Sequence, residues 1–87
     1  MDTSETLAKT ELILQKPPEK WSTLITPTDL KNISPDKIKT SLKKDRAFKS
    51  FIDSYVWEIS LEYDGINPTI VLNAYTGEII DVYGPLN

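Results

Sequence analysis

The chain has 87 residues, a length that allows one small domain with a single modest core. Its hydrophobic share of 39% and charged share of 26% are typical of a globular protein. It contains no cysteine and no histidine. These absences exclude disulfides, thiolate metal sites and the cysteine nucleophile, and they remove the commonest general base. We therefore expect a non-enzymatic domain without a cofactor or a metal.

The net charge of −3 is unevenly distributed. All ten basic residues lie between Lys9 and Lys49, whereas residues 50–87 contain only acidic charges and six of the eight aromatic residues. Nucleic-acid binding usually needs aromatic side chains on a basic surface, so we expect no nucleic-acid partner. Two interpretations remain open. A basic helical layer covers an acidic sheet, or an acidic sheet face meets a basic protein.

The first segment is predicted to be a tail. Residues 1–19 show some helical spacing, but they lack a well-defined cap and end at Pro17-Pro18, where a helix must stop. We expect a flexible N-terminal tail with at most a transient helix, followed by a domain at residues 20–87. Trp21 begins a short extended arm or edge strand, and its large side chain is expected to pack on the core.

A helix is then predicted from Ser34. Ser34 is a good N-cap, Pro35 suits the first helical position, and Ile38 and Leu42 form a buried stripe. The apolar phase breaks after Leu42. We therefore expect a second short helix from Arg46 to about Asp53, capped by Asp45, with one kinked helix as the alternative. Its buried side chains would be Phe48, Phe51 and Ile52.

From Tyr55 onward the pattern is that of strands. The side chains alternate with a period of two, which predicts a half-buried antiparallel strand. The expected inward residues are Tyr55, Trp57, Ile59, Leu61 and Tyr63, and the expected outward ones are Val56, Glu58, Ser60 and Glu62. Two further strands follow at 69–73 and 79–83, with turns at Asp64-Gly65 and at Gly77, where a positive φ is needed.

The predicted fold is α+β: one or two short N-terminal helices packed on a three-stranded antiparallel β-meander. An additional strand near Trp21 is a further option. The core is expected to form where Ile38, Leu42, Phe48 and Ile52 cover the inward side chains of the first strand.

Three segments resemble the PepSY domain family. These are residues 34–39 as its opening helix, residues 55–61 with Asp64-Gly65 as its first long strand and turn, and residues 70–80 as its closing hairpin. In the hairpin, Asn73 and Tyr75 replace the usual Asp and Lys. The resemblance covers about residues 29–82. It implies a non-catalytic module, without a catalytic motif, that binds and restrains a peptidase or another extracytoplasmic protein.

The candidate partner-binding residues are the outward ones: Val56, Glu58, Ser60 and Glu62. Glu58 and Glu62 also suggest acid–base work or Ca²⁺ binding, but an exposed polar face is favoured, because no loop is long enough to build a pocket. The alternative function is a structural or self-associating domain that uses exposed aromatic residues. Candidates for such a patch are Trp21, Tyr63, Tyr75 and Tyr83.

The sequence also gives expectations for the compartment and the oligomeric state of the protein. The first residues do not resemble a signal peptide, and no run approaches the length of a membrane span, so we expect a soluble chain without membrane insertion. The family resemblance implies a secreted or cell-envelope location if the chain is a fragment of a longer protein. A monomer or a weak homodimer is expected.

Overall fold

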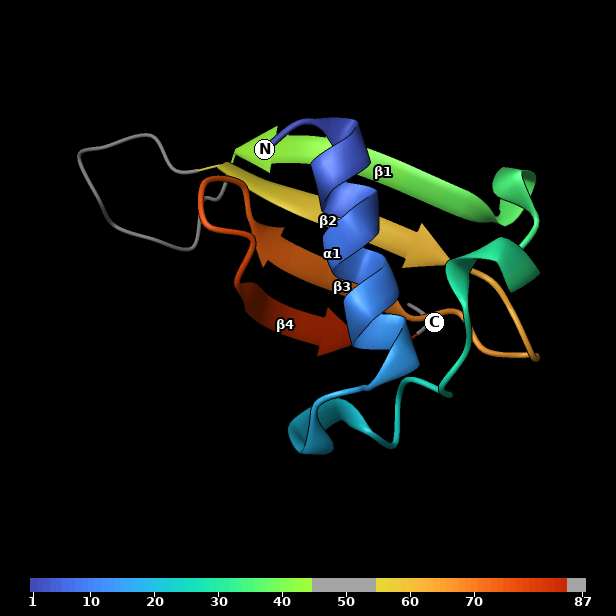
Figure 1. Ribbon diagram of the computed structural model, residues 1–87. Coiled ribbons are helices and arrows are strands. Elements are labelled where there is room, and N and C mark those ends of the chain that lie inside the picture. The colour runs from blue at the N-terminus through green and yellow to red at the C-terminus, as the bar shows by residue number, and fades with distance from the viewer. Residues whose placement is uncertain (45–54, 85–87) are drawn as a thin grey trace.

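In a computed structural model that describes residues 1–44 and 55–84, a helix crosses one face of a four-stranded antiparallel sheet (Figure 1). The strand order is β1-β2-β3-β4, so each strand pairs with the next along the chain. The expected α+β class is confirmed, but the sheet has four strands rather than three. The main elements are α1 (Thr3–Gln15), β1 (Ile38–Lys44), β2 (Tyr55–Leu61), β3 (Thr69–Asn73) and β4 (Ile79–Tyr83). Short 3-10 turns are η1 (Glu19–Trp21), η2 (Leu30–Asn32) and η3 (Pro35–Lys37).

The first segment differs from the expected flexible tail, because Thr3–Gln15 forms α1. Asp2 is its N-cap and accepts a hydrogen bond from the backbone N–H of Glu5. One buried stripe of the helix consists of Thr6, Thr10 and Leu14. The two threonine hydroxyls donate to backbone carbonyls four residues earlier, which satisfies them without water. Two polar residues in the buried stripe weaken the apolar periodicity, which is why the sequence did not predict a stable helix.

The prediction of a helix after Ser34 is wrong. Pro35–Lys37 makes a single 3-10 turn, and Ile38–Lys44 continues as β1, paired with β2. Residues four apart share a face in a helix and in a strand, so the spacing of Ile38 and Leu42 fits both structures. Pairing with β2 decided between them. The second predicted helix, from Arg46 to Asp53 with Phe48, Phe51 and Ile52, lies outside the described residues.

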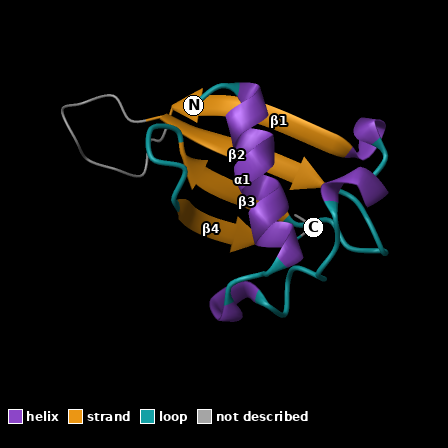
Figure 2. Cartoon of the chain, viewed as in Figure 1, coloured by secondary structure: helices purple, strands orange, loops and turns teal. Residues whose placement is uncertain are grey.

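The core lies between α1 and the sheet (Figure 2). Four of the five expected inward side chains of this region are buried there, but Tyr55 is exposed. The covering layer differs from the prediction: Leu42 is 53% exposed, and Leu14, Ile25 and Ile33 take its place. The expected strand at Trp21 is replaced by η1 and a loop, although Trp21 does pack against the core. The confirmed inward residues are Trp57, Ile59, Leu61 and Tyr63.

The start of α1 is anchored on the turn between β3 and β4. The N-terminal ammonium of Met1 donates to the carbonyl of Ala74 at 2.7 Å, and the indole N–H of Trp57 donates to the Met1 carbonyl at 3.2 Å. Gly77 has the positive φ predicted for it, 76°. A Cβ at this position would lie 2.9 Å from the sulfur of Met1. The positive φ of the turn therefore favours glycine, and a side chain here would also have to displace the flexible side chain of Met1.

Candidate protein-binding face

The face of the sheet opposite α1 carries no helix among the described residues (Figure 1). We call it the outer face. The strand registers place Glu58 of β2 in its centre, opposite Ser41 of β1 and Val71 of β3. The registers thus place the side chains of β2 on alternate faces as predicted, although Tyr55 is exposed and Val56 is buried. By the same registers, the outer face consists of Lys39, Ser41, Lys43, Val56, Glu58, Ser60, Thr69, Val71, Asn73, Asp81 and Tyr83.

The four candidate residues from the sequence are found at or beside this face. Ser60 is exposed and Glu58 is half-buried. Val56 is only 8% exposed, so its side chain offers little surface to another molecule. Glu62 follows the end of β2 and is exposed. Its carboxylate lies 3.4 Å from the ammonium of Lys37.

Glu58 joins three strands through its two carboxylate oxygens. The ammonium of Lys43, on β1, lies 2.8 Å from Oε2, and the hydroxyl of Tyr83, on β4, donates to Oε1. Lys43 and Tyr83 therefore hold the carboxylate from opposite sides, and the contact with Tyr83 spans β3. This arrangement could not be predicted from the sequence, since it requires the strand order. The nearest indication in the sequence was the alternation of side chains, which places Glu58 on the outward side of its strand.

These contacts change the pKa values of both acids. The hydrogen bond from Lys43, followed by the one from Tyr83, lowers the pKa of Glu58 below its usual 4.5, against the opposing effect of burial. The hydrogen bond to Glu58, followed by burial, raises the pKa of Tyr83 from 10.0 to about 12. The ionised carboxylate and the neutral phenol are therefore the forms that this network favours. At neutral pH the outer face carries a fixed, hydrogen-bonded carboxylate near its centre.

A shallow hollow lies at one end of the outer face, with a volume of about 500 Å³. The sequence predicted no pocket because the loops are short. The hollow is instead built where β1 begins, β2 ends and β3 begins. The Ser60 and Thr69 hydroxyls lie 3.3 Å apart within it. Its lining residues are Asp36, Lys37, Lys39, Ser60, Leu61, Glu62, Asn67 and Thr69.

Glu58 and Glu62 do not form the carboxylate pair that was considered from the sequence. Each of them is paired with a different lysine, Glu58 with Lys43 and Glu62 with Lys37. Each carboxylate thus has a basic neighbour of its own. The pair of Glu58 and Lys43 suits polar recognition, because both residues are held in place on strands of the sheet.

A helix on an antiparallel meander, with an open polar face behind it, defines a small α+β domain. Residues 10–83 match the family model described as the peptidase propeptide and YPEB domain, PepSY. The chain therefore belongs to the PepSY family. The comparison with curated proteins gave no match, and neither did the comparison with solved structures.

The residues matched by the family model include part of α1. The match begins at residue 10, within α1, whereas the sequence placed the start of the domain at residue 20. The second half of the helix therefore belongs to the region that the family shares. Among the described residues, none of the helices has the length and apolar character needed to cross a membrane.

Proposed function

We propose that this chain is a non-catalytic binding module that docks on an extracytoplasmic protein and restrains it, with a peptidase as the leading partner. Membership of the PepSY family supports a regulatory or binding role of the kind that peptidase propeptides have. The observation that carries the proposal is the outer face, a polar surface of the sheet that no described helix covers.

The contact surface in this proposal is centred on the hollow. Ser60 and Glu62 line it and are exposed, so they meet the partner directly. Glu58 contributes a carboxylate already fixed by Lys43 and Tyr83. Val56 lies on the same face, two residues before Glu58, and adds little surface because it is buried. A surface that is ordered before binding loses less conformational entropy when the complex forms. The network thus favours a defined partner over indiscriminate contacts.

The test is an inhibition assay with a purified secreted thermolysin-like metallopeptidase. We expect the full chain to slow cleavage of a peptide substrate in a concentration-dependent manner. Ser60→Arg places a long charged side chain in the hollow and should weaken inhibition by about tenfold or more, equivalent to about 1.4 kcal/mol. Ser22→Arg makes the same substitution at an exposed residue after η1 and is the matched control.

Three results would contradict the proposed function. If the chain neither binds nor slows the peptidase, a restraining role toward it is rejected. Equal inhibition by wild type and Ser60→Arg would reject the outer face as the contact surface. Robust turnover of peptidase, esterase or phosphatase substrates by the chain alone, lost in Glu58→Gln or Glu62→Gln, would show that it is an enzyme instead.

A further inference from the structure

Among residues 1–44 and 55–84, no strand pairs with the outer edge of β1, which is the first strand in the order β1-β2-β3-β4. We call this the open edge of β1. The carbonyl of Lys37 accepts a hydrogen bond from the N–H of Glu62 at 3.0 Å, which sets the phase of the β1–β2 ladder. Backbone groups alternate in direction along an antiparallel strand. The N–H and C=O groups of Thr40 and Leu42 therefore point away from β2, and no described segment pairs with them.

The two sides of this edge have different chemistry. On the outer face, Lys39 and Lys43 flank the edge, and both are exposed. Glu58 neutralises Lys43, whereas Lys39 has no ion-pair partner among the described residues. On the α1 side, Leu42 is 53% exposed, although it lies opposite Trp57 in the register. The open backbone thus runs between ammonium groups on one face and an exposed leucine on the other.

The opposite edge of the sheet is less suited to adding a strand. β4 has five residues, and its register with β3 shifts at Val71/Leu72, which marks a bulge. Bulges twist an edge away from regular pairing. The pairing of β1 with β2 runs over seven residues without a shift. Of the two edges, β1 therefore offers the longer and straighter template.

The charges on β1 also select the kind of strand that can be added. If two copies paired antiparallel through this edge, the lysines of both copies would gather on one face, and like charges opposite each other destabilise a sheet. An acidic strand would instead place carboxylates beside Lys39 and Lys43. Its alternate side chains would fall on the α1 side, where Leu42 offers an apolar contact.

We propose that the open edge of β1 binds an extended segment of a partner protein by strand addition, and that this segment alternates acidic with apolar side chains. Its backbone pairs with Thr40 and Leu42, its acidic side chains lie beside Lys39 and Lys43, and an apolar side chain covers Leu42. Backbone hydrogen bonds provide affinity, while the two rows of side chains provide specificity. This edge adjoins the hollow, because Lys39 belongs to both, but its backbone groups are those of Thr40 and Leu42, which do not line the hollow. The inference therefore does not depend on a peptidase partner.

The probe for this proposal is a capped synthetic peptide in which glutamate alternates with valine, measured by calorimetry against the full chain. A peptide with lysine in place of glutamate is the charge-reversed control. We expect only the acidic peptide to bind, and more weakly as salt is added. On binding, hydrogen exchange at the amides of Thr40 and Leu42 should slow markedly. The amide of Ser41, which already faces β2, should change little.

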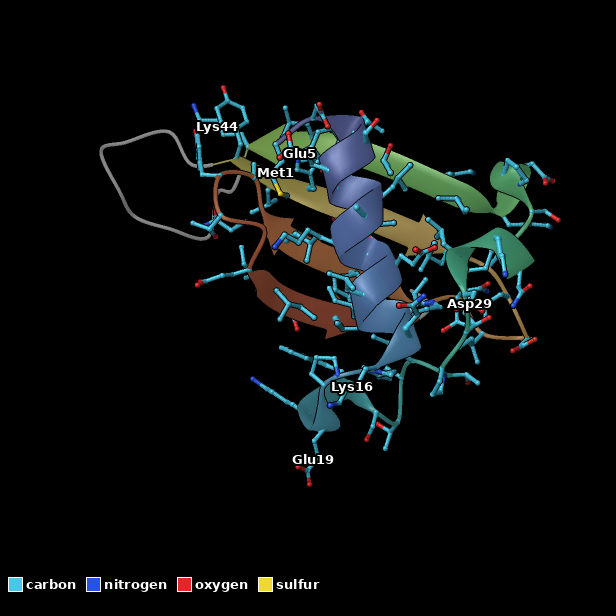
Figure 3. The ribbon with its side chains drawn as sticks, viewed as in Figure 1. Met1, Glu5, Lys16, Glu19, Asp29 and Lys44 are labelled. Carbon is cyan, nitrogen blue, oxygen red and sulfur yellow. The ribbon has the colours of Figure 1, made fainter. Side chains whose placement is uncertain are left out.

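Two variants locate the binding site on β1. Thr40→Pro removes an outward N–H that the sheet does not use, and proline is tolerated at such edge positions. It should weaken peptide binding by about tenfold or more. Lys39→Glu should weaken binding similarly and does not depend on proline being tolerated. The matched control is Lys16→Glu, which makes the same charge change at an exposed residue far from the proposed site. In Figure 3, Met1 and Glu5 lie at the end of α1 nearer β1, and Lys16 lies at the other end.

The proposal is overturned by any of three results. These are no binding of the acidic peptide to wild type, equal binding of the charge-reversed peptide, and unchanged binding in Lys39→Glu. A dimer that forms through this edge without the peptide would contradict the choice of occupant. Thr40→Pro changes no residue that lines the hollow, so it should leave inhibition of the peptidase intact, which separates this test from that of the outer face.

Discussion

Glu58 is the residue on which the order of the outer face depends. Both of its carboxylate oxygens have partners, Lys43 on one side and Tyr83 on the other, so its side chain links β1 to β4 across the sheet. Hydrogen bonds to a charged group are roughly twice as strong as those between neutral groups. Removing the charge of Glu58 should therefore weaken its contacts with Lys43 and Tyr83 more than it weakens the backbone hydrogen bonds of the sheet.

The titration of Tyr83 reports on this contact. Glu58→Gln replaces the carboxylate with a neutral amide, and the pKa of Tyr83 should fall from about 12 toward its ordinary 10.0. Absorbance of the tyrosinate form, recorded as the difference between each protein and its Tyr83→Phe counterpart, isolates this one phenol. An unchanged pKa in Glu58→Gln would show that the hydrogen bond to Glu58 is not the main cause of the shift.

At the scale of the element, α1 is held by a narrow contact. Its inward stripe contains one leucine, Leu14, which is fully buried, whereas Leu12 of the same helix is 62% exposed. The other buried residues of the stripe are threonines whose hydroxyls bond the helix's own backbone. Leu14 therefore provides much of the apolar contact between the helix and the sheet.

Truncating the two leucines distinguishes a packed helix from a tail. Leu14→Ala should lower the free energy of unfolding by about 2–5 kcal/mol, because it removes a buried side chain and leaves a cavity. Leu12→Ala should change it by at most about 0.5 kcal/mol. Urea denaturation followed by circular dichroism measures both variants. If the two variants were equally stable, residues 3–15 would not be packed on the sheet in solution.

At the scale of the whole molecule, the link between Glu58 and Tyr83 makes stability depend on pH at both extremes. The folded pKa of Glu58 lies below 4.5, so its contribution is full above pH 4.5 and is lost as the pH falls through the folded pKa. The folded pKa of Tyr83 is about 12, above the ordinary 10.0. Its contribution is full below pH 10 and is lost as the pH rises through about 12.

Glu58→Gln should flatten both sides of this profile. The free energy of unfolding, measured by urea titration from acid to alkaline pH, should lose part of its acid decline and part of its alkaline decline in this variant. Tyr83→Phe should lose the alkaline part and retain the effect of Lys43 on the acid side. Glu62→Gln removes a carboxylate from an exposed pair, which contributes little, and serves as the matched control. A profile in Glu58→Gln parallel to that of wild type would contradict the prediction.

The sequence alone determined the strand half of the protein. The period of two from residue 55 onward, bounded by the turns at Gly65 and Gly77, predicted β2, β3 and β4 and the burial of Trp57 and Ile59, because alternation has a direct physical cause in the strand backbone. It also placed Glu58 and Ser60 on the opposite face. The resemblance to the PepSY family rested largely on these same residues.

The tertiary structure decided the N-terminal half. Ile38 and Leu42 fit a helix and a strand equally well, and only the partner strand β2 made them part of β1. The helix at residues 3–15 depends on Asp2 as a cap and on the sheet that covers its threonine stripe. The pairing of Glu58 with Tyr83 spans β3, so it exists only once the strand order is set. Local periodicity shows which side of an element is buried, but contacts between distant segments decide which element forms.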